Sequence, residues 1–450
     1  MTRQAGALPR FLALYGALFA AFGVASPFFA AFLAGRALGP EVIGLVLAAG
    51  TAVRLLAGPL GARLADRLAA PRLVLVGFIT AACCIAFLYL PAQGVWLLLL
   101  VSVAHASVLA PINPIADALT LHAAIGRPTV APIGNWTAPA AVGDPMAEAA
   151  PPNPMPVTPL DDRTAQPPIG VPTPEPGSPD PSRRRFEYGW VRGAGSAAFI
   201  LGTLLSGPAV ARFGLNAIIW LNGLLLGLAA WCAHRVSDPA QVPMLVAPAP
   251  LAAPTRSGGV RLLLRLPAFR RLMLVAALIQ GSHAMHDGFI VIHWESLGIG
   301  DATISLLWSE SVAAEVVVFL LIGPWLLDRL TPARASMLAA AAGVVRWAVL
   351  AETTSILASA LVEPLHGLTF ALQHLACMRL IGALVPAELA STAQAFYSTV
   401  AVGAATALLT VASGTLYAQF GAAGFWVMAV LCAAALPLTP GLRPPRDAVT

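Results

Sequence analysis

The sequence predicts an all-α integral membrane protein, because composition and the pattern of apolar residues both exclude a soluble fold. Of 450 residues, 58% are hydrophobic and 10% are charged, whereas soluble domains carry about 25% charged residues. Apolar runs recur along the whole chain, each near the ~20 residues that cross a bilayer as a helix. This recurrence excludes a soluble enzyme with one anchor. A β-barrel is also disfavoured, because its strands alternate apolar and polar residues.

Twelve apolar runs form two sets of six, separated by a polar segment. The runs cover 11–34, 42–61, 73–90, 95–118, 189–211, 215–233, 269–293, 303–327, 335–351, 355–379, 391–417 and 421–439. We therefore expect 12 transmembrane helices in two six-helix bundles. The N-terminal bundle would comprise 1–126 with 186–233, and the C-terminal bundle 269–440.

All 26 basic residues are arginines, and most of them fall in loops that would share one side of the membrane. Cytoplasmic loops carry an excess of positive charge, so we expect both termini to be cytoplasmic. Only Arg36 and Arg212 would then lie on outer loops. Because the cations are spread over short loops, they favour a topological role over a nucleic-acid-binding patch.

Two segments depart from the apolar pattern. Residues 127–185 contain sixteen prolines among acidic and small polar residues, a composition that cannot bury a core. We expect a disordered cytoplasmic insertion there. Residues 234–268, proline-containing and then arginine-rich, would be a central cytoplasmic linker, and 441–450 a cytoplasmic tail.

An internal repeat links the two sets of helices. An Asp-Arg-Leu motif follows the second run of each set, and an arginine stands six residues after each aspartate. The charged residues of the repeat are Asp66, Arg67, Arg72, Asp328, Arg329 and Arg334. Both motifs are expected on cytoplasmic loops. Repeated halves with a site between them are typical of secondary transporters.

The first motif resembles the Gly-x-x-x-Asp-Arg loop of the major facilitator superfamily. Here Gly61 stands five residues before Asp66, where that family usually has four, and the segment after Arg67 is shortened to Ala70-Pro71-Arg72. The resemblance implies the major facilitator fold. It also implies that the six charged residues of the repeat form a latch that holds one conformation.

Ionisable side chains inside apolar runs are candidate functional residues, because charges in hydrocarbon are energetically unfavourable. The run 355–379 places a set of side chains on one stripe of a helix. They are Glu363, His366, Phe370, Gln373 and His374. The two preceding runs add Glu315 and Arg346. We predict that Glu315, Arg346, Glu363 and His366 form a buried network whose protonation changes with substrate occupancy.

This arrangement is similar to that of the lactose permease group and the phenylpropionate permease family, in which acidic, arginine and histidine residues of helices eight to ten handle a coupled proton. Residues 186–196 are similar to the opening of helix five in that family and retain its second arginine as Arg192. The resemblance implies that Arg192 holds substrate and pairs with a carboxylate on helix four. Asp117 is the candidate partner.

Further polar residues are expected to line a substrate cavity. His283 and His286 share a helical face, as a metal-binding pair would, but no further histidine box accompanies them. We therefore expect no metal site and predict that they line the cavity with Asp287. Asn113 and His374 are also predicted to bind substrate.

These observations predict a proton-coupled symporter for a small organic solute. The resemblance points to an aromatic acid such as a phenylpropionate-like compound. A sugar or nucleoside symporter and an efflux antiporter for drugs or metabolites remain alternatives. No nucleophile-base arrangement or phosphate-binding loop favours an enzyme, although a polytopic enzyme or sensor is the non-transport alternative. We expect a multi-pass monomer in a bacterial inner membrane, without cofactor, whose partners are substrate, protons and lipid.

Overall fold

The computed structural model describes residues 7–125, 186–236 and 259–442. The described residues within 1–123 and 187–450 form one compact unit, which we call the first unit. The predicted insertion at 127–185 lies outside the described residues, as do most of the predicted linker and tail. The fold and the site described below belong to the first unit.

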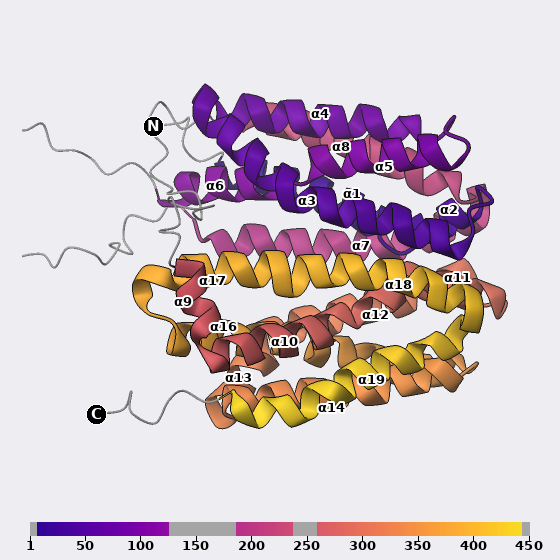
Figure 1. The fold of residues 1–450 in the computed structure, drawn as a ribbon. Coiled ribbons are helices and arrows are strands. Elements are labelled where there is room, and N and C mark those ends of the chain that lie inside the picture. The colour runs from indigo at the N-terminus through magenta and orange to yellow at the C-terminus, as the bar shows by residue number, and fades with distance from the viewer. Residues whose placement is uncertain (1–6, 126–185, 237–258, 443–450) are drawn as a thin grey trace, which may run out of the picture. The chain divides into compact units, whose positions relative to one another are not determined.

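The described residues form helices and no strands (Figure 1). Those of the first half are α1 (Ala7–Ala25), α2 (Phe29–Ala34), α3 (Pro40–Leu68), α4 (Pro71–Leu88), α5 (Val95–Leu109), α6 (Ile112–Ile125), α7 (Tyr188–Phe213) and α8 (Asn216–Arg235). Those of the second half are α9 (Gly259–Arg265), α10 (Pro267–Gly281), α11 (His283–Ser296), α12 (Asp301–Val317), α13 (Gly323–Arg329), α14 (Pro332–Glu352), α15 (Ile356–Val362), α16 (Gln373–Leu384), α17 (Ala390–Phe396), α18 (Ala405–Phe420) and α19 (Phe425–Ala435).

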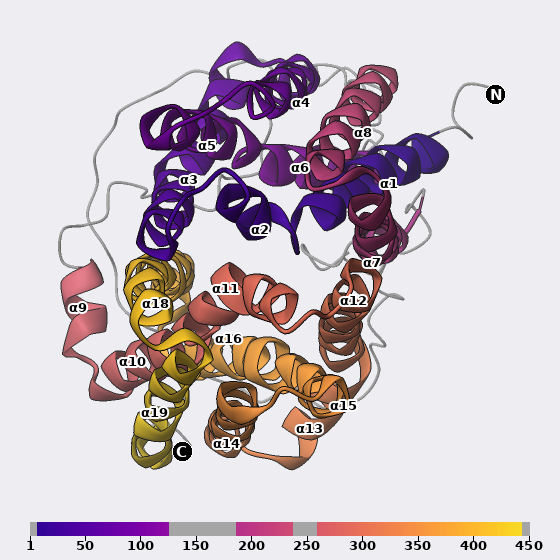
Figure 2. The ribbon, with the colours of Figure 1, turned by 90° about the vertical axis from the view of Figure 1, so that its right-hand side faces the viewer.

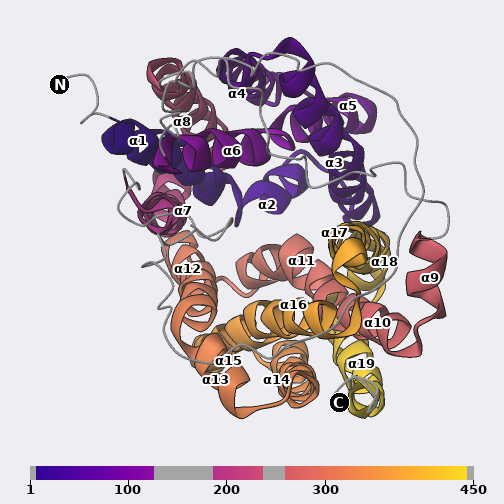
Figure 3. The same ribbon diagram turned by 90° about the vertical axis from the view of Figure 1, so that its left-hand side faces the viewer.

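Within the first unit the helices gather into two groups. Views along the helices show α1 to α8 in one group and α10 to α19 in the other (Figures 2 and 3). We call these the N-terminal bundle and the C-terminal bundle. Each predicted set of six apolar runs therefore gathers in its own bundle.

Ten helical stretches among the described residues are long and apolar enough to cross a membrane. One of them, Ala390–Gly441, is 52 residues long and covers two of the predicted runs. The run at 269–293 is divided between α10 and α11, and each is shorter than one span requires. The all-α membrane fold is thus confirmed, while the count of twelve spans and the cytoplasmic position of the termini stay predictions.

Large apolar side chains cover much of the exterior. Trp96 is 82% exposed and Leu357 is 69% exposed. A soluble protein seldom exposes extended apolar surface, whereas lipid tails solvate such side chains as well as a protein interior does. The exposed apolar residues therefore fit a surface that contacts lipid.

The break between α10 and α11 has a specific stabilising contact. Ser282 stands at the break and donates its hydroxyl proton to the carbonyl of Ile279 over 2.7 Å. The indole N–H of Trp347, on α14, donates to the Ser282 hydroxyl oxygen over 2.9 Å. A side chain from a neighbouring helix thus fixes the break immediately before His283 and His286.

The two bundles meet through backbone at the end where α3 begins. A Cβ atom on Gly44 of α3 would lie 2.8 Å from the carbonyl oxygen of Thr410 on α18. A Cβ atom on Gly414 would lie 2.6 Å from the carbonyl oxygen of Pro40. Only glycine allows this approach, because any side chain at either position would push the two helices apart.

Candidate functional site

Glu363 is the centre of a buried ionisable cluster in the C-terminal bundle. Its Oε2 accepts a hydrogen bond from Arg346 over 2.7 Å, and its Oε1 lies 3.1 Å from Nε2 of His286. The side chains of Glu363 and Arg346 are both 0% exposed. The pair therefore lies in a dry environment, where either partner alone would be a costly uncompensated charge.

The cluster continues from Arg346 to α12. Arg346 donates to Nδ1 of His366 over 3.0 Å. Because arginine only donates, this contact assigns the ring proton of a neutral His366 to Nε2. That nitrogen lies 3.3 Å from Oε2 of Glu315, so His366 can donate to Glu315 while it accepts from Arg346.

A π-helical segment, Gly367–Leu372, follows His366. A Cβ atom on Gly367 would lie 2.7 Å from the carbonyl oxygen of Ala314, so the absence of a side chain lets this segment approach α12 closely. Glu315 is the next residue on α12. The close approach thereby positions Glu315 beside His366, and π-helical turns of this kind are common at functional sites.

On the other side of Glu363, His286 has two possible partners for the same nitrogen. Nε2 lies 3.1 Å from Arg346 and 3.1 Å from Glu363. Without a proton on Nε2 the ring accepts from the arginine, and with one it donates to the carboxylate. Nδ1 of His286 lies 3.3 Å from Oδ1 of Asp287. An imidazolium at this position can therefore donate to two carboxylates at once.

These contacts make one continuous line of ionisable side chains through α11, α14, the segment before α16, and α12. In order the line reads Asp287, His286, Glu363, Arg346, His366 and Glu315. Its interior members are largely or fully buried. Its first member is not, because 55% of the Asp287 side chain is exposed.

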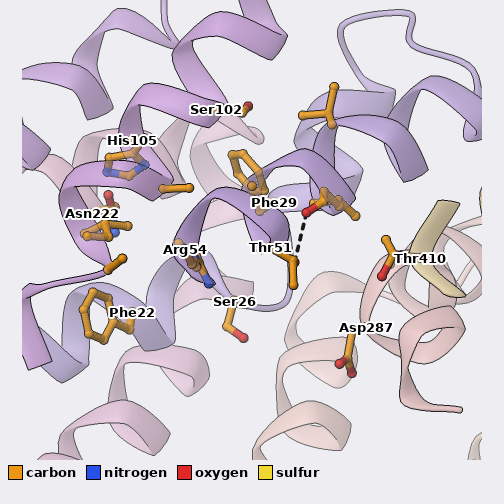
Figure 4. A pocket seen from close by; sticks show the side chains of 18 of the residues that line it. Phe22, Ser26, Phe29, Thr51, Arg54, Ser102, His105, Asn222, Asp287 and Thr410 are labelled. Atoms are coloured by element: carbon orange, nitrogen blue, oxygen red, sulfur yellow. Dashed lines mark hydrogen bonds between the residues drawn. The ribbon is translucent and has the colours of Figure 1, made fainter. Parts of the chain in front are cut away.

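Asp287 reaches a cavity of about 620 Å³ that lies between the two bundles. This volume is within the range of small-molecule sites in proteins. The N-terminal bundle supplies most of the wall, including Arg54, His105 and Asn113, and the C-terminal bundle supplies Asp287 and Thr410. Figure 4 shows several of these side chains, with Arg54 on α3 and Asp287 on α11.

Comparison with known proteins identifies the family. The model of the MFS_1 like family matches residues 10–129 and 182–428, which is more than half of the chain. The chain belongs to the MFS_1 like family. Solved structures show the same fold. A mutant of the nucleoside transporter NupG superposes on this protein with a TM-score of 0.74 at 13% identity, covering 97% of this chain and 99% of that one.

Two further relatives add to this assignment. A protein of Escherichia coli (strain K12) named "Probable 3-phenylpropionic acid transporter" is 31% identical over 444 residues, covering 97% of this chain and 98% of that protein. An auto-inhibited peptide transporter of the POT family superposes with a TM-score of 0.57 at 14% identity, covering 98% of this chain and 96% of that one. The chain is thus a membrane transporter of the major facilitator type and not an enzyme, as the sequence predicted.

The structure of this MFS_1 like protein brings together the four residues predicted to couple protons and adds His286. His283 takes a different position. It is buried, with Nδ1 3.1 Å from the carbonyl oxygen of Gln280 and Nε2 2.9 Å from the hydroxyl of Thr369. Both ring nitrogens therefore have protein partners, and His283 does not line the cavity.

The side chains predicted to share one stripe of the run 355–379 contact two different sets of residues. Glu363 and His366 join the ionisable line, and Phe370 stacks on His366 with ring centroids 5.3 Å apart. His374 instead lies 3.3 Å from the hydroxyl of Tyr397 and outside the cavity wall. The π-helical segment between the two sets changes the angular spacing of side chains, which a regular helical projection cannot anticipate.

Asp117 and Arg192, predicted to bind substrate, lie together in the N-terminal bundle. Their side-chain atoms approach to 3.6 Å, and the Tyr15 hydroxyl also donates to Asp117. Arg192 stacks over the ring of Phe19 at 5.2 Å. Neither residue of the pair is among those that line the cavity, whereas Asn113 is.

The residues of the repeated motif lie on helices rather than on loops. Asp66 and Arg67 occupy the last turn of α3, and Arg72 the first turn of α4. The connection is short because Ala69 adopts a left-handed conformation with φ of 47° and Pro71 starts the next helix. Arg72 donates to the carbonyl of Val236 over 3.2 Å.

The second copy of the motif makes a contact that the sequence did not reveal. Asp328 accepts from Arg379 of α16 over 2.6 Å, and the same arginine donates to the carbonyl of Leu327 over 2.6 Å. Arg329 stacks over Trp325 at 4.2 Å. The backbone N–H of Arg334 is capped by Thr331. The ion pair here thus joins the motif to a different helix.

Arg54 lines the cavity but was not among the residues predicted from the sequence. It lies at the middle of α3, within an apolar run, where the rule that selected Arg346 would also have selected it. The arginines that follow it at positions 63, 67 and 72 obscured this signal. Its position in the cavity wall makes it a candidate binding residue.

Proposed function

We propose that this protein is a proton-coupled symporter that carries a small organic acid, of the aromatic type, across a bacterial inner membrane by alternating access. The observation that carries the proposal is the line of ionisable side chains from Asp287 to Glu315. It begins in the cavity wall and continues through a dry bundle. A substrate in the cavity and a proton on this line would therefore act on each other's binding.

In this proposal, His286 links proton binding to substrate binding by exchanging Arg346 for Glu363 as the hydrogen-bond partner of its Nε2. A proton from the cavity side reaches Asp287 first, because this carboxylate is the exposed end of the line. Protonation of His286 at Nε2 turns the ring from an acceptor for Arg346 into a donor for Glu363. The change redistributes the contacts of the buried pair, and buried networks of this type hold discrete arrangements.

The substrate class is supported by the cavity wall and by the relative from Escherichia coli. Aromatic side chains of the N-terminal bundle contribute to the wall, namely Phe22, Phe29, Tyr89 and Phe199. They provide an apolar surface for an aryl ring. The relative's name includes 3-phenylpropionic acid, an aryl acid of this type. The likeness to the nucleoside and peptide transporters, at 13% and 14% identity, supports the fold alone.

The test is uptake of labelled 3-phenylpropionate by proteoliposomes under an imposed proton gradient. We expect Glu363→Gln and Glu315→Gln to abolish accumulation against a concentration gradient, because neither amide can release a proton. Exchange of labelled for unlabelled substrate without a gradient should persist in at least one of them. Glu352→Gln is the matched control, because Glu352 lies at the exposed end of α14 and accepts a hydrogen bond from Trp426 outside the ionisable line.

Proton-driven accumulation retained by both variants would overturn the coupling. The alternative of efflux by antiport makes a different prediction for direction. In right-side-out vesicles with an inwardly directed proton gradient, a symporter accumulates the acid and an antiporter expels it. The same vesicles loaded with labelled nucleosides or sugars test the other substrate classes.

A further inference from the structure

Arg54 is a cation at the middle of a predicted span, and no described residue forms a hydrogen bond or an ion pair with it. Its side chain is exposed within the cavity (Figure 4). By contrast, Arg346 of the C-terminal bundle is fully buried and paired with Glu363. Charges in a membrane protein normally face water or a partner. Arg54 therefore presents five unused N–H donors to whatever occupies the cavity.

Two further polar atoms of the same wall also lack partners among the described residues. They are Nε2 of His105 and Oδ1 of Asn113, each shielded from solvent. The His105 ring packs against Tyr89 with centroids 5.6 Å apart, which fixes its orientation. Buried polar atoms in native proteins nearly always have a hydrogen-bond partner. Orphan atoms that line a cavity consequently indicate a place for the polar groups of a ligand.

The charges of the wall are arranged with opposite signs on opposite bundles. Among the described lining residues, Arg54 is the one arginine and Asp287 is the one carboxylate. Asp287 already has His286 at 3.3 Å, whereas Arg54 has no ion-pair partner in the described parts of the chain. A carboxylate that enters this cavity is attracted to α3 and repelled from α11. Its orientation is thereby determined.

The geometry points to Arg54 as the residue that binds the substrate carboxylate, with Nε2 of His105 as a second donor and the aromatic side chains of the N-terminal bundle as the surface for the aryl ring. A guanidinium matches a carboxylate with two parallel hydrogen bonds. This inference rests on the proposed function, because it takes an organic acid as the substrate. It replaces Arg192 in that role, since the charge of Arg192 is already balanced by Asp117 and the pair lies outside the cavity wall.

The test measures equilibrium binding of 3-phenylpropionate and of uncharged 3-phenylpropanamide to detergent-purified protein, without any gradient. We expect Arg54→Gln to weaken binding of the acid roughly 10- to 100-fold, as loss of a charge-assisted hydrogen bond does. Binding of the amide should change little. Arg54→Lys, which keeps the charge but not the two-pronged geometry, should be intermediate. Arg212→Gln is the control, because Arg212 is exposed at the end of α7.

Several outcomes separate this inference from the proposed function. Unchanged acid affinity in Arg54→Gln overturns the inference alone. Loss of acid affinity in Arg192→Gln with retention in Arg54→Gln assigns the carboxylate to the residue that the sequence suggested. If unmodified protein binds neither compound, the organic-acid function itself fails. The unfolding temperature of each variant verifies that the cavity is folded.

Discussion

The two bundles hold their deep arginines in opposite ways. Arg346 of the C-terminal bundle is fully buried and bonded to Glu363, His286 and His366. Arg54 of the N-terminal bundle is exposed in the cavity and has no ion-pair partner among the described residues. A buried, paired cation is engaged by the protein's own side chains, whereas a cation in a cavity that pairs with no described residue is available to a ligand. In the proposed mechanism, the C-terminal bundle therefore handles protons and the N-terminal bundle holds the solute.

The largest expected effect is a loss of stability when Arg346 is substituted, and it tests the difference between the two bundles. Arg346→Gln removes the guanidinium that balances the buried carboxylate of Glu363, so we expect a loss of about 3–5 kcal/mol in stability. The double variant Arg346→Gln with Glu363→Gln should recover most of it. Arg54→Gln should change stability by less than about 0.5 kcal/mol, because Arg54 makes no ion pair with any residue that the structure describes. Thermal unfolding of the purified proteins in one detergent measures all three. Equal losses at Arg54 and Arg346 would remove the distinction between the bundles.

A smaller effect is expected at the helix break that precedes His286. Trp347→Phe removes the indole N–H that donates to Ser282 but keeps an aromatic ring in the buried site. We expect a loss of about 1 kcal/mol, the usual contribution of one hydrogen bond. Trp325→Phe is the matched control because Trp325 is 52% exposed. No loss in Trp347→Phe relative to this control would mean that packing alone holds the break.

The smallest effect is expected at the Asp117–Arg192 pair. Arg192 is 43% exposed and Asp117 is 32% exposed, and partly exposed ion pairs contribute about 0–1 kcal/mol. Asp117→Asn keeps an oxygen that can accept from Tyr15. Its unfolding temperature should therefore stay close to that of the unmodified protein. The more exposed pair at Asp328 offers a comparison through Asp328→Asn, and a large loss for Asp117→Asn alone would assign the first pair a structural role.

Much of this architecture could be predicted because the membrane imposes a simple rule on composition. Apolar runs predicted the helices, and ionisable residues within them predicted the contacts among Glu315, Arg346, Glu363 and His366. Composition identifies which residues are unusual in a membrane-spanning run, but it does not give the direction in which each side chain points. It could not tell that His286 joins the ionisable line while His283 bonds to Thr369, since both occur on one apolar run.

The remaining differences arise from departures of the backbone from a regular helix. The break at Ser282 and the π-helical segment 367–372 change the direction of every side chain that follows them, so a helical projection fails there. Arg54 is a different case. Its signal was present in the sequence, and only the surrounding arginines concealed it. The partner of Asp328 could not be foreseen, because Arg379 lies 51 positions away on another helix.

The close approach of Gly44 and Gly414 has a consequence for the response of the transporter to salt. At that end of α3 the bundles meet through uncharged backbone, and contacts of this kind are insensitive to ionic strength. At the other end of the same helix lie Asp66 and Arg67, both exposed, and salt screens exposed charges of this kind. Raising the ionic strength should therefore leave the contact between Gly44 and Gly414 unchanged while it screens the charges at the far end of α3.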